Sequence, residues 1–134
     1  MNKLNNVLEP LKLDLTAPLS TWPTQINQPQ KYDLILCTNV IHITPWKCTE
    51  GLFNATGILL KPSSLLVTYG PYSVDGVLVP ESNIRFDQSL RAQNPEWGVR
   101  DTRQLNQLAN QNGLTLIKMF DLPANNKILV FKKI

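Results

Sequence analysis

The sequence predicts an α/β domain built on an incomplete, doubly wound and mostly parallel sheet with an antiparallel last strand. Two nearly continuous apolar runs, at residues 32–38 and 64–69, are typical of strands that are covered on both faces. Stretches with apolar residues at helical spacing lie between and after these runs. Such an alternation of strands and helices favours a parallel sheet with helices on both faces.

The first 45 residues contain two expected strands separated by a loop. Residues 11–15 alternate apolar and polar, which indicates a short strand. Residues 18–30 are rich in Pro, Thr, Asn and Gln, so we expect a loop there, with at most a helical turn near residues 19–22. After the strand at 32–38, Thr44 and Pro45 form a typical helix start.

The rest of the chain alternates helices with strands. Pro62 should end the first helix, and Ser82 should cap a short helix that reaches about Arg91. Asp101 is expected to cap a second helix, which Gly113 would end.

Two strands complete the chain, at residues 115–121 and 127–132. The link between them is short and polar, which suits an antiparallel pair.

Composition excludes several classes of protein. The 134 residues suggest one domain, and the fractions of 43% hydrophobic and 17% charged residues argue against disorder. No apolar run approaches the ~18 residues needed to cross a bilayer, and the N-terminus lacks the apolar region of a signal peptide. We therefore expect a cytoplasmic protein that has no membrane partner.

Metal and nucleic-acid binding are also disfavoured. Cys37 and Cys48 do not have a metal-ligand spacing, so reduced thiols and no metal site are expected. The net charge is only +3, and the basic residues are scattered rather than gathered in a stripe beside stacking aromatic residues.

Polar residues follow the predicted strands at their carboxyl ends. Asp14 ends the first, Asn39 and His42 follow the second, and residues 69–72 end the third. Ligands of open α/β sheets bind outside these ends, so we expect the side chains to converge on one crevice.

Several motifs resemble the methyltransferase-like protein 26 family, a family of uncharacterised proteins. The resemblance runs from about residue 11 to residue 132. It rests on Cys48-Thr-Glu-Gly-Leu-Phe53, Thr68-Tyr-Gly-Pro-Tyr72, Pro80-Glu-Ser-Asn83 with Phe86-Asp87, Asn94-Pro-Glu-Trp-Gly98 with Arg100-Asp101, and Pro123-Ala-Asn-Asn-Lys127.

The resemblance implies a class I, Rossmann-type methyltransferase sheet with strand order 3-2-1-4-5-7-6. Residues 1–134 would form a single partial domain that supplies strands 3 to 7. Strands 1 and 2, with their glycine-rich turn and ribose-binding acid, are then missing, and no G-x-G pattern occurs here. S-adenosylmethionine is thus the expected cofactor only if the N-terminal half is supplied, and the chain alone should not bind it.

The resemblance also assigns site residues. Asp14, Leu15, Thr38 and Asn39 would contact the cofactor, although Asp14 can equally be a surface residue or a turn former. His42 is the only histidine and has a pKa near neutrality, so it can act as a catalytic base beside Asn39. The alternative is that Asn39 and His42 satisfy backbone groups in a tight loop.

A second group would bind the methyl acceptor, which is either a small molecule or a protein. Alternatively, Arg100 pairs internally with Asp87 or Asp101, and Trp97 packs in the core. The acceptor group consists of Tyr69, Tyr72, Asn83, Asp87, Arg91 and Arg100.

The missing strands would leave Tyr32–Thr38 as an open sheet edge without protecting charges over residues 34–36. Such edges recruit other chains, so we expect self-association or a partner strand there. A non-catalytic remnant that acts as a binding module is therefore the alternative to part of a methyltransferase.

One turn departs from the family pattern. Before the strand at 64–69, the usual Lys-Pro-Gly-Gly is Lys61-Pro-Ser-Ser64. Because glycine relieves strain at positive φ, serine there predicts an altered or mildly destabilised turn.

Overall fold

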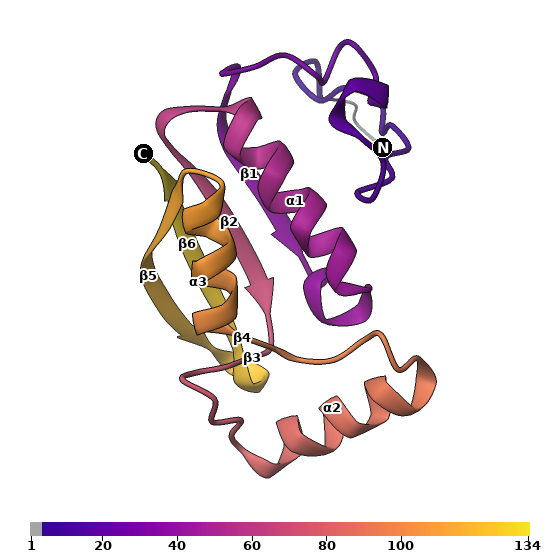
Figure 1. The fold of residues 1–134 in the computed structure, drawn as a ribbon, viewed down its shortest axis with the longest axis vertical. Helices are drawn as coiled ribbons and strands as arrows, with labels where there is room; N and C mark the ends of the chain where they lie inside the picture. The colour runs from indigo at the N-terminus through magenta and orange to yellow at the C-terminus, as the bar shows by residue number, and fades with distance from the viewer. Residues whose placement is uncertain (1–3) are drawn as a thin grey trace.

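The computed structural model describes residues 4–134 and contains a four-stranded sheet in the order β1-β2-β6-β5 (Figure 1). The strands are β1 (Tyr32–Thr38), β2 (Leu60–Gly70), β5 (Leu114–Leu122) and β6 (Asn126–Lys133). β1 pairs with β2 in parallel, whereas β6 runs antiparallel to both β2 and β5. The predicted mostly parallel sheet with an antiparallel last strand is confirmed, and its order corresponds to 4-5-7-6 of the expected sheet.

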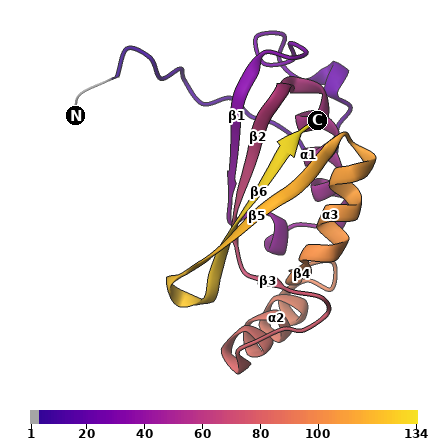
Figure 2. The ribbon, with the colours of Figure 1, turned by 90° about the vertical axis from the view of Figure 1, so that its left-hand side faces the viewer.

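The two helices that pack against this sheet lie on the same face of it. Figure 2 shows α1 (Trp46–Leu59) and α3 (Thr102–Gln111) on one side, with no helix among residues 4–134 on the other. The expectation of helices on both faces is therefore not met within the described chain. β1 shows the consequence, because Leu34 and Leu36 are 55% and 63% exposed.

α2 and a short pair of strands lie beyond the carboxyl ends of β1 and β2. α2 (Glu81–Gln93) projects below the sheet in Figures 1 and 2. A short parallel pair, β3 (Tyr72–Ser73) with β4 (Arg100–Asp101), connects this region to α3. Three single turns complete the fold: η1 (Leu19–Thr21), η2 (Ile41–Ile43) and η3 (Pro123–Asn125).

The main core fills the space between the helices and the sheet. The rings of Phe53 on α1 and Phe131 on β6 meet edge to face, with centroids 5.0 Å apart and planes at 87°. Both side chains are fully buried, as are those of Leu66, Leu105 and Leu129. These residues come from both helices and from the two central strands, so they bind the two layers together.

The predicted strand at residues 11–15 is wrong. Residues 11–14 form no strand, and a turn follows at residue 15. The Asp14 carboxylate accepts hydrogen bonds from the Thr16 amide at 2.9 Å and the Thr16 hydroxyl at 2.7 Å. Such local side-chain bonds compete with strand pairing, and β1 lies at the edge of the described sheet with no partner for this segment. The predicted helical turn is confirmed by η1.

The bounds of α1 differ from those predicted. Pro45, not Thr44, is the residue before the first helical turn, because the Thr44 hydroxyl donates to the Val40 carbonyl at 2.8 Å. The helix also ends at Leu59, before Pro62, since Leu60 is already extended and begins β2.

The predictions for the C-terminal half hold more closely. α2 covers the expected region, but the predicted cap at Ser82 is wrong: the helix starts at Glu81 after Pro80, and Ser82 lies within its first turn. Asp101 caps α3, accepting from the Arg103 amide at 2.9 Å, and Gly113 follows the helix with φ of 78°. The final antiparallel pair is β5 with β6.

Membrane insertion has no candidate helix: over residues 4–134, none combines the length and apolar character needed to cross a bilayer.

Residues 61–64, expected as a turn before the strand, belong to β2 at an irregularity in its pairing with β1, and Ser63 has a φ of 69°, which glycine would favour. Ser63→Gly should raise the free energy of unfolding by about 1 kcal/mol, since a left-handed backbone is costly for residues with a Cβ. Urea unfolding followed by circular dichroism measures this. The matched control Ser64→Gly, at a residue without positive φ, should be neutral or destabilising; equal stabilisation by both variants would contradict the strain at Ser63.

Candidate functional site

The ends of β1 and β2 bring Asn39 and Tyr69 together. Thr38 pairs with Tyr69 in the register of the two strands, and the next amide, of Asn39, donates to the Tyr69 carbonyl at 2.9 Å. Asn39 has φ of 54°, a left-handed conformation that asparagine tolerates better than most residues. The chain therefore turns away from the sheet directly after β1 and exposes the Asn39 side chain at the strand end.

His42 follows in η2 and is only 6% exposed. Its ring packs against that of Phe86 on α2, with centroids 5.7 Å apart and planes inclined by 55°. A Cβ at Gly70, the last residue of β2, would lie 3.3 Å from His42 Nδ1, so glycine leaves room for the imidazole at the strand end. The His42 carbonyl accepts from the Gly98 amide at 3.0 Å. The histidine is thus held between β2, α2 and the link that leads to β4.

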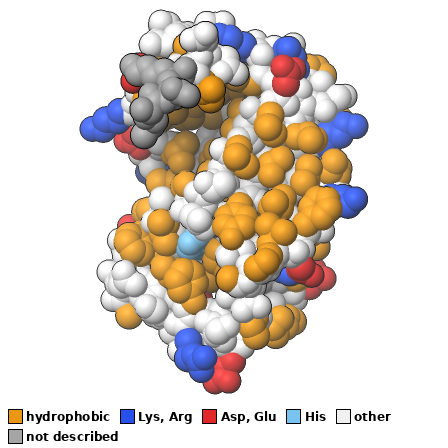
Figure 3. Space-filling view, turned by 180° about the vertical axis from the view of Figure 1, so that it is seen from behind, with side chains coloured by type: hydrophobic (Ala, Val, Ile, Leu, Met, Phe, Trp, Pro, Cys, Tyr) orange, Lys and Arg blue, Asp and Glu red, His pale blue; other side chains and the backbone are white. Residues whose placement is uncertain are grey.

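Burial lowers the pKa of His42 below its usual 6.5. The imidazole is therefore neutral near pH 7 and can accept a proton. On the face seen in Figure 3, the one histidine, in pale blue, lies between hydrophobic side chains. This apolar surrounding favours the uncharged imidazole.

Two of the expected acceptor-binding residues are buried and already bonded within the protein. Tyr72 is 3% exposed, and its hydroxyl donates to Thr68 Oγ1 at 2.9 Å. Burial raises the pKa of Tyr72 well above its usual 10, so its proton is not available near neutral pH. Asn83 is 7% exposed and donates to the carbonyls of Val79 and Asn125, both at 3.3 Å. Both side chains are therefore engaged within the protein rather than exposed to a methyl acceptor.

Asp87 and Arg91 form an internal pair on α2. Arg91 Nε lies 3.1 Å and 3.0 Å from the two Asp87 carboxylate oxygens, and Asp87 also accepts from the Val99 amide at 2.8 Å. An internal pair was one of the sequence-based alternatives, but Arg91, not Arg100, is the partner. Asp101 is engaged as the cap of α3 and by the Ser73 hydroxyl at 2.6 Å.

Arg100 is held by backbone carbonyls and an aromatic ring. Its Nη2 donates to the carbonyls of Thr44 at 3.1 Å and Glu96 at 2.7 Å, and the guanidinium lies 5.6 Å from the centre of the Trp46 ring. Burial and the neighbouring Arg91 lower the pKa of Arg100, while Asp87 opposes this effect. Arg100 thereby connects the start of α1 to the α2–β4 link. Trp97 of this link is half-buried.

Asp14 contacts Thr16 and Leu15 contacts α1, so neither residue joins this cluster. Asp14 is exposed, and its hydrogen bonds with Thr16 lower the pKa of the carboxyl below its usual 3.8. Leu15 packs on α1: a Cβ at Gly51 would lie 1.7 Å from the Leu15 carbonyl oxygen. Absence of a side chain at Gly51 therefore allows the N-terminal segment to lie directly on the helix.

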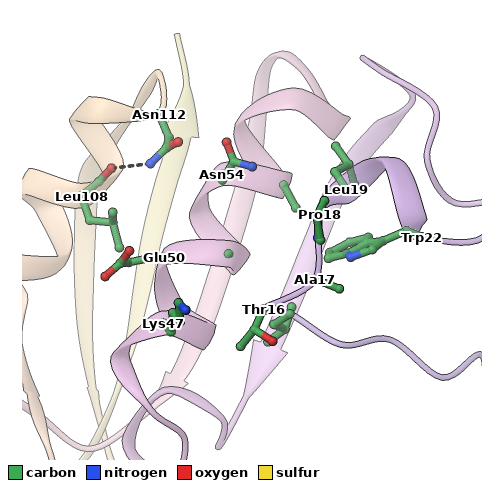
Figure 4. A pocket seen from close by; sticks show the side chains of 13 residues that line it. Thr16, Ala17, Pro18, Leu19, Trp22, Lys47, Glu50, Asn54, Leu108 and Asn112 are labelled. Atoms are coloured by element: carbon green, nitrogen blue, oxygen red, sulfur yellow. Dashed lines mark hydrogen bonds between the residues drawn. The ribbon is translucent and has the colours of Figure 1, made fainter.

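Two hollows border this N-terminal segment. Figure 4 shows the first, of about 410 Å³, where Thr16, Lys47, Glu50 and Asn54 give a polar lining. The second, of about 510 Å³, is mainly apolar and opens between the segment, α1 and β1. Leu15 and Trp22 line both. Sequence reasoning missed these hollows, because no local pattern marks a cavity between distant segments.

A metal centre has no candidate here, because no group of three or more His, Cys, Asp or Glu side chains within residues 4–134 is arranged to hold an ion.

The fold is similar to part of several solved methyltransferase structures. Human N-acetylserotonin methyltransferase in complex with SAM is 14% identical, with a TM-score of 0.71 over 92% of this chain and 33% of that one. Mitomycin 7-O-methyltransferase MmcR gives 17% identity and a TM-score of 0.71, again over 92% and 33% of the two chains. An O-methyltransferase family protein from Burkholderia thailandensis gives 13% and 0.63 over 75% and 30%.

The chain thus spans about a third of the length of these structures. By sequence, it belongs to DUF938, a family of proteins of unknown function, whose model matches residues 1–133.

The buried histidine makes the stability of the fold depend on pH. Well above pH 6.5 the imidazole is neutral in both the folded and the unfolded chain. Below pH 6.5 the unfolded chain takes up the proton first, because the pKa of folded His42 is lowered, so the free energy of unfolding should fall. Urea unfolding at pH 7.5 and pH 5 should show this loss, and His42→Asn should reduce it.

The two carboxyl groups with lowered pKa values, Asp14 and Asp101, titrate below 3.8 and do not contribute in this range. The same pH dependence in wild type and His42→Asn would contradict the burial of an uncharged imidazole. Since His42 is the only histidine, its two ring C–H signals in proton NMR give the pKa directly.

Proposed function

We propose that this chain forms the methyl-acceptor side of an S-adenosylmethionine-dependent methyltransferase, of the kind found in the methyltransferase-like protein 26 family. The single observation that carries the proposal is the position of His42. A neutral, buried base lies at the carboxyl ends of β1 and β2, where the sheet of an α/β domain binds its ligands. The methyltransferase fold and the O-methyltransferases among its structural relatives support this interpretation.

In this proposal, His42 accepts the proton of an acceptor hydroxyl as the oxygen becomes a nucleophile. Asn39, exposed at the end of β1, orients the acceptor, and Phe86 and Tyr69 provide apolar walls. S-adenosylmethionine, when bound, supplies an electrophilic methyl group. The internal bonds of Tyr72, Asn83, Asp87, Arg91 and Arg100 give these residues a positioning role behind the acceptor.

The residues of this chain fit the acceptor side better than the cofactor side. Asp14, assigned to the adenine, is bonded to Thr16 and ends no strand. Leu15 is engaged with α1, which leaves Thr38 and Asn39 as the cofactor contacts at the strand end. The glycine-rich turn and the ribose-binding acid must then come from outside these residues, and we expect the chain to act in the cytoplasm with them.

A second candidate function is a binding module that uses the edge of β1. Within residues 4–134, β1 pairs only with β2, and the apolar hollow of about 510 Å³ opens beside it. Side chains of an added strand would alternate between the two faces of the sheet. One set would extend the core beside Ile35 into the hollow, and the other would cover Leu34 and Leu36. A second copy of this chain or a partner strand can fill this place.

Isothermal titration calorimetry tests whether this chain binds the cofactor without the other half of the proposed enzyme. The chain alone should show no heat with S-adenosylmethionine at millimolar concentration, because in this proposal the glycine-rich turn and the ribose-binding acid lie outside these residues. Micromolar binding would contradict the proposed division of the site.

The acceptor side can be tested independently with phenol, a small aromatic hydroxyl compound. Phenol should shift the ring signals of His42 in a saturable manner, and Phe86→Ala should weaken binding several-fold by removing the ring beside the imidazole. Ile58→Ala, on the exposed side of α1, is the matched control. Unchanged His42 signals up to saturating phenol would favour the non-catalytic binding module.

The open edge gives a further expected outcome. Size-exclusion chromatography with light scattering should show concentration-dependent self-association of the wild type. Leu36→Lys should suppress it, because a charge on an edge strand opposes pairing. Ile58→Lys adds the same charge on the helical layer and should have no effect. A stable monomer for the wild type would contradict self-association through β1.

A further inference from the structure

We propose that α2 is a lid over His42, which must swing away from the strand ends before a methyl acceptor can reach the imidazole. This inference rests on the proposed role of His42 as the base. His42 is only 6% exposed, and the Phe86 ring of α2 packs on it with centroids 5.7 Å apart. An acceptor hydroxyl has no path to an imidazole covered in this way, so the arrangement is a closed one.

The side of α2 that faces the protein is mostly polar. Its members, Asn83, Asp87 and Leu90, recur at helical spacing, and the other side chains of the helix are exposed. Leu90 is the one buried apolar side chain of α2, and no residue of this helix belongs to the main core between the sheet, α1 and α3. Elements with few buried apolar contacts open at a low free-energy cost, and lids are elements of this kind.

Hydrogen bonds, rather than core packing, fix α2 to the protein. Asn83 Nδ2 donates to the Asn125 carbonyl at 3.3 Å, and Asn125 Nδ2 donates to Ser82 Oγ at 3.3 Å. Asp87 accepts from the Val99 amide at 2.8 Å. Water can replace each of these bonds when α2 moves, so their loss costs far less than the loss of core packing would.

A glycine on each side of α2 provides a hinge. Gly76 has φ of 81° in the loop before the helix, and Gly98 has φ of 154° in the link after it. The Gly76 amide is bonded to Asp101 at 2.7 Å and the Gly98 amide to the His42 carbonyl at 3.0 Å, so both hinges are fixed to the body of the protein. Glycine changes φ at little steric cost, which allows residues 77–97 to turn as one unit. Figures 1 and 2 show α2 projecting beyond the sheet, with a link at each end.

A disulfide between α2 and the β5–β6 turn tests the lid in the intact chain. Ser82→Cys with Asn125→Cys places two thiols where the structure has a 3.3 Å hydrogen bond, and peptide mapping confirms which thiols are joined. Diethyl pyrocarbonate acylates the imidazole of His42, the only histidine, and ultraviolet absorbance follows the reaction. Closing the disulfide should slow this acylation at least about tenfold, and the reduced form of the same variant is the matched control.

A second variant loosens the lid. Asn83→Ala removes the donor to Asn125 and should speed the acylation several-fold. Gln88→Ala, on the exposed side of the same helix, should leave the rate unchanged. Equal rates for the oxidised and reduced forms of the double-cysteine variant would overturn the proposal. So would a wild-type rate equal to that of free N-acetylhistidine, because the imidazole would then be uncovered.

The lid and the proposed base fail on different results. Slower acylation in the oxidised form, with no response of the His42 signals to phenol, would support the lid and reject the base. A phenol response that is equally fast and equally strong in the oxidised and reduced forms would support the base and reject the lid.

Discussion

The edge-to-face contact of Phe53 with Phe131 is the interaction on which the remaining structure depends. It joins α1 to β6, the strand that lies between β2 and β5 and bonds to both. A fully buried aromatic side chain contributes several kcal/mol when its loss leaves a cavity. Because α1 begins just after η2, the contact fixes on the sheet the helix that follows His42. The histidine itself is then held by its contacts with Phe86, Gly70 and Gly98.

The sheet of this chain can be predicted from sequence because its signals are local. The apolar runs of β1 and β2, the cap at Asp101 and the turn between β5 and β6 each depend on a few neighbouring residues. The prediction of a strand at residues 11–15 was wrong because strand formation depends on a partner that is distant in the sequence. Their alternation suits a strand, but a strand needs a partner, and local bonds between Asp14 and Thr16 take its place.

In the candidate site too, features set by neighbouring residues could be predicted, whereas features set by distant contacts could not. Placing Asn39, His42 and Tyr69 near one another requires only the order of the strands, and the structure joins Asn39 to Tyr69 and His42 to Gly70. The pair of Asp87 with Arg91 has the i,i+4 spacing of a helical ion pair and could be read from the sequence, whereas the hydrogen bond from Val99 to Asp87 depends on the approach of α2 to the link before β4. Burial of Tyr72 and Asn83 likewise follows from long-range packing. Sequence alone identified polar residues of the region without separating those that face a ligand from those that brace the fold.

The contact between Leu15 and Gly51 links the two hollows that flank the N-terminal segment. The segment rests on α1 through a backbone carbonyl, at a distance where not even a methyl group fits. Leu15 lines both hollows, so a shift of this residue would change both of them. Gly51→Ala would push the N-terminal segment away from α1 and change the shape of both hollows, whereas the sheet and His42 would stay in place. The lack of a side chain at Gly51 therefore allows the close contact that holds the N-terminal segment on α1.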